Sequence, residues 1–402
     1  MASQRYDTVI IGAGVIGLAT AFRVAQRGLT VAIADPEPGS GASRAAAGML
    51  APVSEAWYGE EELLGFGLTA RERYPSFAAE LTELTGAPTG YTQAGTLQVA
   101  YDSDDLAMLE RVHELHLKLG LQARRVTARE ARSIEPMLAP TVRGGVHVPA
   151  DGSVDPRLLT RALLLAVARC GVAVHRQHVR EVTLAAGGAD GVALADGTRL
   201  AAASVVLATG WQAGEIAGVP PAALPPVRPV KGQILRLHSQ QPILTGAVRG
   251  IVRGSSVYLV PRASGELVVG ATQEELGADT RVTAGGVWEL LRDARELVPG
   301  LTELELAEVT AGLRPGTPDN APVLGPSALP GLVLATGHFR SGILLAPVTA
   351  DLIAEFLDTK RLPRAAARFS PARFSAEPFA AEPFAAAEPF AAAEPAAGEA
   401  PA

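Results

Sequence analysis

Tyr6-Asp-Thr-Val-Ile-Ile-Gly-Ala-Gly-Val-Ile-Gly17 is the stretch that decides the fold. Its first six residues form an apolar strand, and its last six form a complete G-x-G-x-x-G turn. Residues 18–27 have helical spacing, and a second apolar run, residues 29–34, ends at Asp35. Strand, glycine turn, helix, strand and acid within about 30 residues are typical of a dinucleotide-binding unit. The order favours such a site over a purely structural turn, and leaves flavin and nicotinamide nucleotides both open.

Each part of this unit has a physical role in holding a dinucleotide. Gly12 permits the tight turn, Gly14 lets the backbone approach a pyrophosphate, and Gly17 lets the helix pack closely on the strand. The pyrophosphate charge meets the amide groups of the helix N-terminus, and the acid accepts hydrogen bonds from ribose hydroxyls. The expected cofactor contacts in this unit are Gly12, Gly14, Val15, Ile16, Gly17 and Asp35.

Composition bounds the class of protein. With 402 residues the chain is long enough for about two domains, and 48% hydrophobic against 19% charged residues indicate a globular protein. The net charge of -7 opposes a nucleic-acid surface, which needs a basic face. Cys170 is the sole cysteine, so we expect neither a disulfide framework nor a metal site. Residues 9–22 lack a basic n-region and no run reaches the ~18 residues of a spanning helix, so we expect a cytoplasmic protein without membrane contact.

Further along the chain, parallel-type and antiparallel-type strands alternate. Residues 204–207 read as a buried parallel strand that ends at Thr209-Gly210, and residues 331–336 as another, followed by a helix over 343–357. Residues 227–269 instead alternate like antiparallel strands. Further helices are expected over 60–84, 104–119 and 155–170.

These patterns predict an α/β fold in which a Rossmann-like dinucleotide domain is interleaved with an antiparallel-sheet α+β substrate domain. We expect the first domain to take residues 1–88, 141–218 and 309–364, and the second to take residues 89–140 and 219–308. From Phe374 onward the chain repeats Phe-(Ala/Ser)-Ala-Glu-Pro with variations. A proline every five or six residues forbids a continuous helix. The prediction is a folded body ending near Arg364 and a disordered tail over 365–402, with a partner-binding segment as the alternative.

Five stretches make the chain resemble the D-amino-acid-oxidase-like flavoproteins, within them the glycine-oxidising branch of thiamine synthesis, over roughly residues 7–357. They are the N-terminal unit; Gly41-Ala-Ser-Arg-Ala-Ala-Ala-Gly-Met-Leu50; Val227-Arg-Pro-Val-Lys-Gly-Gln233; Tyr258-Leu-Val-Pro-Arg262 with Val268-Val-Gly-Ala-Thr272; and Ala311-Gly-Leu-Arg-Pro-Gly-Thr-Pro-Asp319 with Gly337-His-Phe-Arg-Ser-Gly-Ile-Leu-Leu-Ala-Pro347. The last pair is the most specific.

The resemblance implies non-covalent FAD and oxidative deamination of glycine, and of sarcosine and small D-amino acids. The products are an imine that hydrolyses to glyoxylate and ammonia, and hydrogen peroxide from oxygen. In the family the imine feeds the thiazole of thiamine, so the thiazole-forming enzyme is a candidate partner. The resemblance also implies a homotetramer.

The resemblance assigns further cofactor residues. A hydroxyl and a guanidinium on the loop after Asp35 suit the phosphate edge, small residues suit the face of the isoalloxazine ring, and a valine matches the adenine side. The loop before residue 343 directs a helix N-terminus, with about half a positive charge, at the flavin N1–C2=O edge. These residues are Ser43, Arg44, Ala46, Ala47, Gly48, Met49, Val179, Thr209, Gly210, His338, Phe339, Arg340, Ser341, Gly342 and Ile343.

The resemblance also assigns the substrate side. Arg314 matches the carboxylate-binding arginine, Tyr258 the tyrosine that adds a hydroxyl, and Arg340 a second arginine near the amine. Gln273 and Ser256 replace a methionine and a histidine near the substrate, so the substrate range is open. No general base is expected, because the family transfers hydride from Cα to the flavin and the enzyme's work is orientation and charge placement.

Competing interpretations remain at this stage. A sarcosine oxidase would often attach its flavin through a cysteine near Leu313, whereas Cys170 lies far away in the sequence. A D-amino-acid dehydrogenase would pass electrons to a membrane carrier instead of oxygen. A flavin domain of tRNA modification is opposed by the acidic charge, and a non-catalytic cofactor-binding protein by the presence of Arg314 and Tyr258.

Overall fold

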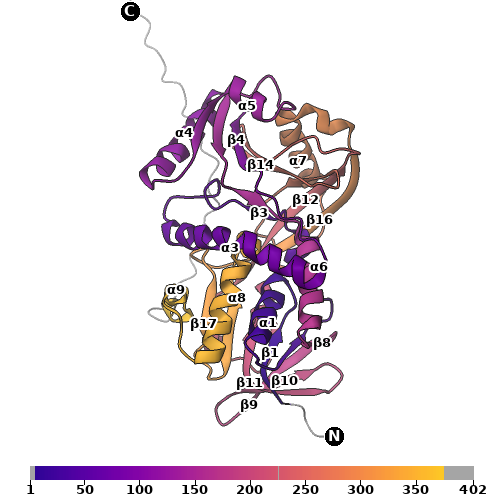
Figure 1. Ribbon diagram of the computed structural model, residues 1–402, viewed down its shortest axis with the longest axis vertical. Coiled ribbons are helices and arrows are strands. Elements are labelled where there is room, and N and C mark those ends of the chain that lie inside the picture. Colours follow the sequence, from indigo (N-terminus) through magenta and orange to yellow (C-terminus); the bar gives the residue numbers. More distant parts are fainter. Residues whose placement is uncertain (1–4, 225, 375–402) are drawn as a thin grey trace, which may run out of the picture.

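Two eight-stranded sheets organise the part of the chain that the computed structural model describes, residues 5–224 and 226–374. They lie in the lower and upper lobes of Figure 1; the helix α3 (Glu61–Thr85) lies across the boundary between them, and α6 (Pro156–Arg169) runs down from it beside the lower sheet. A small sheet of β3 (Met49–Leu50) and β7 (Gly152–Ser153) also lies between the lobes. The mixed parallel and antiparallel topology confirms the expected fold class.

The first sheet is built around parallel strands. It contains β1 (Arg5–Ile11), β2 (Val31–Ala34), β8 (Ala173–His175), β9 (Val179–Ala185), β10 (Gly188–Leu194), β11 (Arg199–Leu207), β17 (Val323–Pro326) and β18 (Leu332–Thr336). The main path has the order β17-β18-β11-β1-β2-β8, and β10 and β9 continue from β11. β1 pairs in parallel with β2 on one side and β11 on the other. The glycine turn after β1 therefore leaves the carboxyl edge of a parallel sheet, where ligands bind in such folds.

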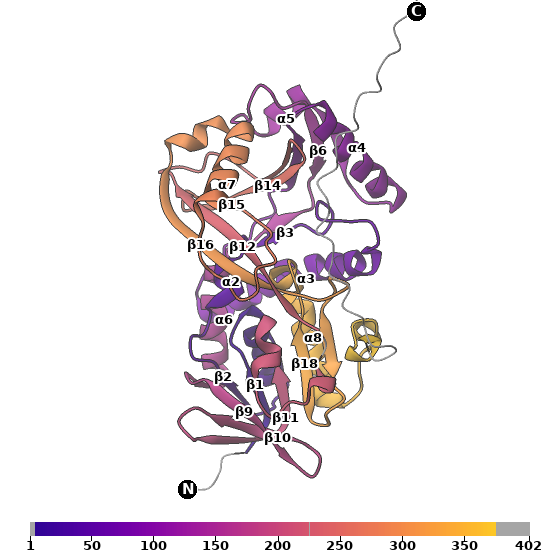
Figure 2. The ribbon, with the colours of Figure 1, turned by 180° about the vertical axis from the view of Figure 1, so that it is seen from behind.

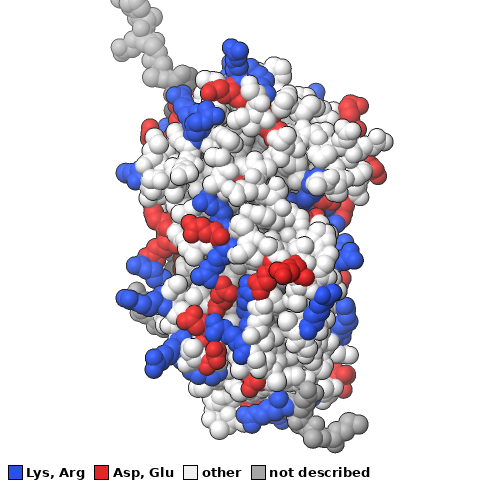
Figure 3. All heavy atoms as spheres, viewed as in Figure 1, with Lys and Arg blue, Asp and Glu red and all other residues white. Residues whose placement is uncertain are grey.

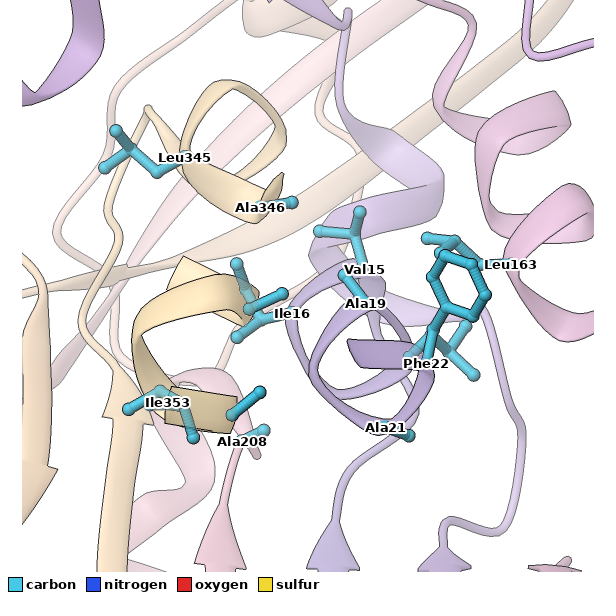
Figure 4. Close-up of a cluster of buried hydrophobic side chains, with 14 of the residues drawn as sticks. Val15, Ile16, Ala19, Ala21, Phe22, Leu163, Ala208, Leu345, Ala346 and Ile353 are labelled. Carbon is cyan, nitrogen blue, oxygen red and sulfur yellow. The ribbon is translucent and has the colours of Figure 1, made fainter. Parts of the chain in front are cut away.

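Helices pack closely over this sheet. α1 (Val15–Gln26) contacts both α6 and α8 (Gly342–Thr359), and nine of its 12 residues are buried. A helix that is apolar on nearly all sides belongs inside a protein. Figure 4 shows Phe22 of α1 beside Leu163 of α6, and Ile16 on the side of α1 that faces α8. This core fixes the position of the α1 N-terminus.

The second sheet is almost entirely antiparallel. It contains β4 (Thr96–Ala100), β5 (Arg124–Thr127), β6 (Gly144–Val148), β12 (Arg228–His238), β13 (Ala247–Val252), β14 (Ser255–Pro261), β15 (Glu266–Gly270) and β16 (Glu305–Gly316). Their order is β16-β12-β15-β14-β13-β4-β6-β5, and β13 with β4 is its parallel pair. The helix α7 (Ala284–Leu297), which the sequence did not predict, packs on the sheet through Leu290, Ala294 and Leu297. The helices α4 (Ser103–Lys118) and α5 (Ala128–Ile134) lie over its other end.

Two expected domain boundaries are wrong in position. β6 pairs with β4 and β5, so residues 144–148 belong to the second sheet rather than to the first domain. β16 pairs with β12 from Glu305 to Gly316, so the second sheet also extends past residue 309. Figure 2 shows β16 as a long strand that descends from the upper lobe toward the lower one. Long β-pairing, rather than local composition, therefore sets where the chain changes lobes.

The expectation that the folded body ends near Arg364 is also wrong. A short helix α9 (Arg364–Ala367) and a turn of 3-10 helix (Pro371–Phe374) follow α8. Phe369 is 5% exposed, its ring centroid lies 4.6 Å from that of Phe66, and its carbonyl accepts from the Leu324 amide at 2.8 Å. Residues 365–374 therefore belong to the folded body, with Ala366 and Phe369 buried, and the repeat prediction for 375–402 lies outside the described residues.

Charges of both signs are interspersed on the face of the molecule shown in Figure 3. Within residues 5–224 and 226–374, none of the helices combines the length and the apolar character needed to cross a membrane.

Candidate active site

The glycine turn is shaped by close backbone approaches. Gly12 has a φ of 99°, and a Cβ added there would lie 2.5 Å from the Ala208 carbonyl oxygen. A Cβ at Gly17 would lie 2.0 Å from the Gly12 carbonyl oxygen. Both distances are far below any tolerated contact, so only glycine permits this turn. The turn thus brings the N-terminus of α1 to the sheet edge.

Asp35 and Ser43 lie against this turn. The Asp35 carboxylate accepts hydrogen bonds from the Ala13 amide at 2.6 Å and from the Glu37 amide at 2.7 Å. The Ser43 hydroxyl accepts from the Val15 amide at 3.0 Å, in the first turn of α1. An acid for ribose and a hydroxyl at the helix N-terminus are thus held where a pyrophosphate would meet the helix.

Arg44 follows Ser43 directly in the sequence. It lies in the short helix α2 (Gly41–Ala45) with an exposed side chain, and its carbonyl accepts from Arg236 at 3.2 Å. The Arg44 backbone therefore helps to join α2 to the second sheet, and the phosphate contact of its guanidinium stays a prediction.

The segment after α2 lies between the two sheets. Gly48 has a φ of 76°, and a Cβ there would lie 2.1 Å from the Val154 carbonyl oxygen. Ala47 is buried, and its carbonyl accepts a hydrogen bond from Arg262. Ala46 and Met49 are partly buried. A flat ring could lie against this small-residue backbone.

Thr209 and Gly210 follow β11 at the same sheet edge as the glycine turn. The Thr336 hydroxyl donates to the Gly210 carbonyl at 2.7 Å, which joins this turn to β18. The Thr209 hydroxyl is buried and, among the described residues, has no hydrogen-bond partner. A buried hydroxyl without a partner at a ligand-binding edge is what a bound polar group would satisfy. Val179 begins β9 and packs beside the first-sheet core.

The loop before α8 is fixed to the end of β16. The Phe339 amide donates to the Pro315 carbonyl at 2.9 Å, and Phe339 has a φ of 46°. His338 is buried and contacts the Thr349 hydroxyl at 3.0 Å, and burial lowers the pKa of its imidazole to about 3. His338 is therefore neutral and architectural. The helix α8 begins at Gly342, one residue before the predicted start at Ile343, and Ser341 occupies its N-cap position without a side-chain capping hydrogen bond.

Arg314 and Tyr258 come together on one face of the second sheet. The Arg314 guanidinium lies over Gly232, where a Cβ would be 2.4 Å from its Nη1. The Tyr258 ring lies over Gly270, where a Cβ would be 2.4 Å from its hydroxyl. Burial raises the pKa of the Tyr258 phenol, and the nearby Arg314 charge opposes that rise. Two glycines thus clear the space in which both side chains lie flat on the sheet.

Arg314 is held by carbonyl groups and not by a carboxylate. Its Nη1 donates to the Lys231 carbonyl at 3.3 Å and to the Thr272 carbonyl at 3.2 Å. Across residues 5–224 and 226–374, no acidic side chain lies within ion-pair distance of it. Carbonyl acceptors orient a guanidinium but leave its charge uncompensated. Arg314 can therefore receive a carboxylate.

A buried polar network fixes those two carbonyl groups. Lys231 is fully buried, and its Nζ lies 3.3 Å from Glu274 and 3.2 Å from Asp279. Its backbone amide and carbonyl pair with Glu274, while the Thr272 hydroxyl accepts from the Gln233 amide at 2.8 Å. The loop that presents the Thr272 carbonyl is thus pinned to β12.

The other residues predicted to lie near the substrate are either paired within the protein, as Arg340 is, or exposed, as Gln273 and Ser256 are. Arg340 forms an ion pair with Glu60, which also accepts from Asn320 at 3.0 Å. Gln273 follows buried Thr272 and is exposed, and Ser256 is exposed on β14. Arg340 borders a shallow, open hollow lined in part by Glu55, Trp57 and Leu344.

The sequence did not single out four residues near this site: Arg249, Glu55, Ser54 and Asp151. Arg249 of β13 forms an ion pair with Glu55 at 2.6 Å, and its Nη1 lies 3.9 Å from the Met49 sulfur. Neighbouring Ser54 donates its hydroxyl to fully buried Asp151 at 2.6 Å, and burial raises the pKa of that carboxyl to about 6. No local motif marks these residues, because each is defined by a partner far away in the chain.

The residues at the first-sheet edge fit a flavin dinucleotide. The cradle at Gly12 and Gly17, the acid at Asp35 and the unpartnered Thr209 hydroxyl line one edge, and the Gly48 segment leads from there to Arg249 and Tyr258. A dinucleotide bound at the first-sheet edge would extend along the Gly48 segment toward Arg249 and Tyr258. The arrangement can therefore place a redox ring beside a carboxylate-binding arginine.

Comparison with known proteins agrees with this geometry. Residues 7–356 match the family model described as "FAD dependent oxidoreductase". The chain is 34% identical to a glycine oxidase from Geobacillus kaustophilus, over 92% of this chain and 97% of that protein. A crystal structure of glycine oxidase from the same organism superimposes with a TM-score of 0.84 at 35% identity, covering 91% of this chain and 98% of the other.

The chain is also 36% identical to a bifunctional protein ThiO/ThiG from Trichormus variabilis, over 87% of this chain. It covers only 52% of that relative, so it spans about half the length of the bifunctional protein.

Proposed function

This chain belongs to the FAD-dependent oxidoreductase family of the D-amino-acid-oxidase type, and on that premise we propose that it oxidises glycine with oxygen. The reaction converts glycine, oxygen and water into glyoxylate, ammonia and hydrogen peroxide. Sarcosine and small D-amino acids are expected as further substrates. The glycine oxidase from Geobacillus kaustophilus supports this choice, since it aligns over nearly the whole of both chains.

Arg314 is the observation that carries the proposal. Its guanidinium is oriented by the Lys231 and Thr272 carbonyl groups and has no acidic partner in the described part of the chain. A substrate carboxylate can pair with it, and the Tyr258 hydroxyl is close enough to share the same carboxylate. Glycine itself offers little else to hold, so one well-oriented carboxylate contact must supply most of the binding energy.

These residues contribute to the reaction by orienting the substrate. Bound FAD supplies the electron acceptor, which takes a hydride from the carbon that bears the amine. With the carboxylate fixed at Arg314, Cα of the substrate can face a ring held along residues 46–49. The α8 N-terminus, which begins after Ser341, adds positive potential toward the same region. No side chain of this site needs to remove a proton from Cα.

We further propose that the imine supplies the thiazole of thiamine and that the thiazole-forming enzyme is a separate partner. The fused relative supports this, because the present chain aligns with one half of a two-function protein. A homotetramer is proposed from the family resemblance alone.

An amino-acid panel assayed for both oxygen consumption and peroxide release tests the function. Glycine and sarcosine should be oxidised best, D-alanine more weakly, and L-amino acids and D-phenylalanine poorly. Oxidation only with an artificial electron acceptor would favour a dehydrogenase instead. Good activity on large D-amino acids without activity on glycine would favour a general D-amino-acid oxidase.

A further inference from the structure

A second arginine lies beside the proposed carboxylate site, on the same face of the second sheet. Arg249 is directly opposite Tyr258 in the β13–β14 ladder, which places the Cβ atoms of such a pair about 4.5–5.5 Å apart. The row of directly paired residues runs on from Tyr258 of β14 to Gly270 of β15, Ile234 of β12 and Thr310 of β16. Arg314 follows Thr310 by four residues on one strand, so it faces the same side. Two guanidinium groups therefore flank Tyr258.

The guanidinium groups of Arg249 and Arg314 have different kinds of partner. In the described part of the chain, Arg314 donates to two backbone carbonyl groups and has no acidic partner, whereas Arg249 is bound to Glu55 at 2.6 Å. The side chains of Arg249 and Glu55 are 20% and 15% exposed, so water screens the pair incompletely. Because Arg249 is paired with Tyr258 in the ladder, the ion pair lies beside Tyr258, and both charges act on the ionisation of its phenol.

Glu55 comes from the loop that follows the proposed flavin-facing segment. Met49 of that segment contacts Arg249, and Glu55 lines the hollow that Arg340 also borders. Neighbouring Ser54 is anchored through its amide and hydroxyl to buried Asp151, at 3.2 and 2.6 Å. The carboxylate of Glu55 is thus held in place by structure around it and does not depend on substrate.

An unpaired arginine at this position would bind a second carboxylate of a substrate already held at Arg314. With Glu55 in place that charge is compensated, and a second carboxylate would have to approach the Glu55 carboxylate. Specificity in such a site is obtained by opposing the wrong ligand as much as by binding the right one.

We propose that Glu55 confers specificity for amino acids with a single carboxylate by occupying Arg249, which is a latent receptor for a second carboxylate. The inference rests on the proposed oxidation of small amino acids at Arg314.

Sarcosine and iminodiacetate are the matched probes, because iminodiacetate is sarcosine with a carboxylate added to its methyl group. The wild-type enzyme should prefer sarcosine. Glu55→Gln keeps the shape of the side chain and removes its charge, so the kcat/KM ratio of iminodiacetate to sarcosine should rise about 10-fold or more. Adding Arg249→Leu to Glu55→Gln should return the ratio to near the wild-type value.

A binding measurement separates this inference from the proposed function. Methoxyacetate and diglycolate have the shapes of sarcosine and iminodiacetate but lack the amine, and their binding can be followed through the flavin absorption spectrum. Glu55→Gln should tighten diglycolate relative to methoxyacetate by about 10-fold or more. This holds even if the wild-type enzyme oxidises neither glycine nor sarcosine, a result that would defeat only the proposed function.

Glu296→Gln is the matched control. This substitution removes a surface ion pair of 3.3 Å between Glu296 and Arg253, which lies at the end of the same β13–β14 hairpin. It should leave both ratios unchanged. If Glu55→Gln fails to retain FAD, Glu55→Asp, whose carboxylate is one methylene shorter, should move both ratios in the same direction by a smaller factor. Unchanged ratios in the Glu55 variant that folds, or an equal rise in the double variant, overturn the proposal.

Discussion

At the scale of single residues, charge compensation distinguishes the roles of similar side chains. Arg314 and Arg340 both come from motifs of the family resemblance, yet Arg340 is paired with Glu60 while Arg314 has no acidic partner in the described chain. The first is stabilised within the protein, and the second depends on a ligand for a counter-charge. Only the second is expected to dominate substrate binding.

Arg314→Ala should reduce kcat/KM for glycine by about 30-fold or more, since removing one partner of a desolvated charge pair costs ~2–5 kcal/mol. FAD content should stay normal, because Arg314 lies on the second sheet. Arg314→Lys should lose less activity, as it keeps the charge without the forked geometry. Near-normal kcat/KM in Arg314→Ala would show that the carboxylate binds elsewhere.

Asp151 provides a stability prediction with a defined pH window. Burial raises the pKa of its carboxyl from 3.8 to about 6, so the folded protein binds this proton more tightly than the unfolded chain. The contribution of Asp151 to stability is therefore greatest below about pH 4 and falls as pH rises to about 6. Asparagine does not titrate.

The melting temperature of the wild type minus that of Asp151→Asn should accordingly decrease between pH 4 and 6 and then level off. Using the difference removes the contributions of other carboxyl groups. An increase over the same window would mean that the Arg71 charge, 3.6 Å away, outweighs burial.

At the scale of elements, the pairing of β12 with β16 builds the substrate face. Val230 is opposite Arg314 and Gly232 is opposite Gly312, so a side-chain-free area lies beside the arginine. The guanidinium lies across that area and reaches the carbonyl groups of two different chain segments. The geometry of the site is therefore a property of the strand pair.

Gly232→Ala should raise KM for glycine by about 10-fold with FAD retained, because the added methyl group would lie 2.4 Å from Arg314 Nη1. Gly285→Ala is the control, since a Cβ there meets nothing within 4 Å and Gly285 is exposed in α7. Steady-state kinetics of the two variants check this. Unchanged KM in Gly232→Ala would mean that the guanidinium moves aside at no cost.

The segment after α8 contributes to stability through Phe369. Phe369→Ala should lower the free energy of unfolding by about 3–5 kcal/mol, as expected for a buried aromatic side chain, and a chain ending at Arg364 should lose at least as much. A chain ending at Phe374 keeps every contact described above and is the control. Urea unfolding measures all three, and a loss below ~1 kcal/mol in Phe369→Ala would show that the segment packs only weakly.

At the scale of the whole molecule, the site exists because the chain passes repeatedly between two sheets. The glycine turn and α8 come from the first lobe, Arg249, Tyr258 and Arg314 from the second, and residues 46–49 lie between them. The ion pair of Arg157 with Glu308, at 2.7 Å, joins α6 to β16 across this boundary. Cofactor and substrate residues are thus held at a fixed separation.

Acid precipitation of the purified yellow protein should release intact FAD into the supernatant. Cys170, the sole cysteine, is partly buried at the end of α6 and packs against the first-lobe core, away from the substrate face. Absorbance of the supernatant and pellet measures the release. Flavin that stays with the pellet would indicate a covalent link through another residue.

Much of the fold follows from the sequence alone, because the patterns that determine it are local. The strand, glycine turn and helix of residues 6–27 fold as predicted, and the helix after the residue 337–342 loop begins where expected. Asp155 accepts from two amide groups as the predicted cap of α6. Capping, glycine turns and apolar periodicity act over a few residues, so they can be recognised without the rest of the chain.

Only the tertiary structure decided the features that depend on distant partners. Lobe membership of β6 and β16 follows from strand pairing, burial of Phe369 requires Phe66, and the compensation of Arg249 requires Glu55, 194 positions away. A strand pattern does not specify its neighbour, and a charged side chain does not specify its counter-ion. The sequence therefore determined which residue types and local elements were present, while the packing of two sheets determined which arginine stays free for a ligand.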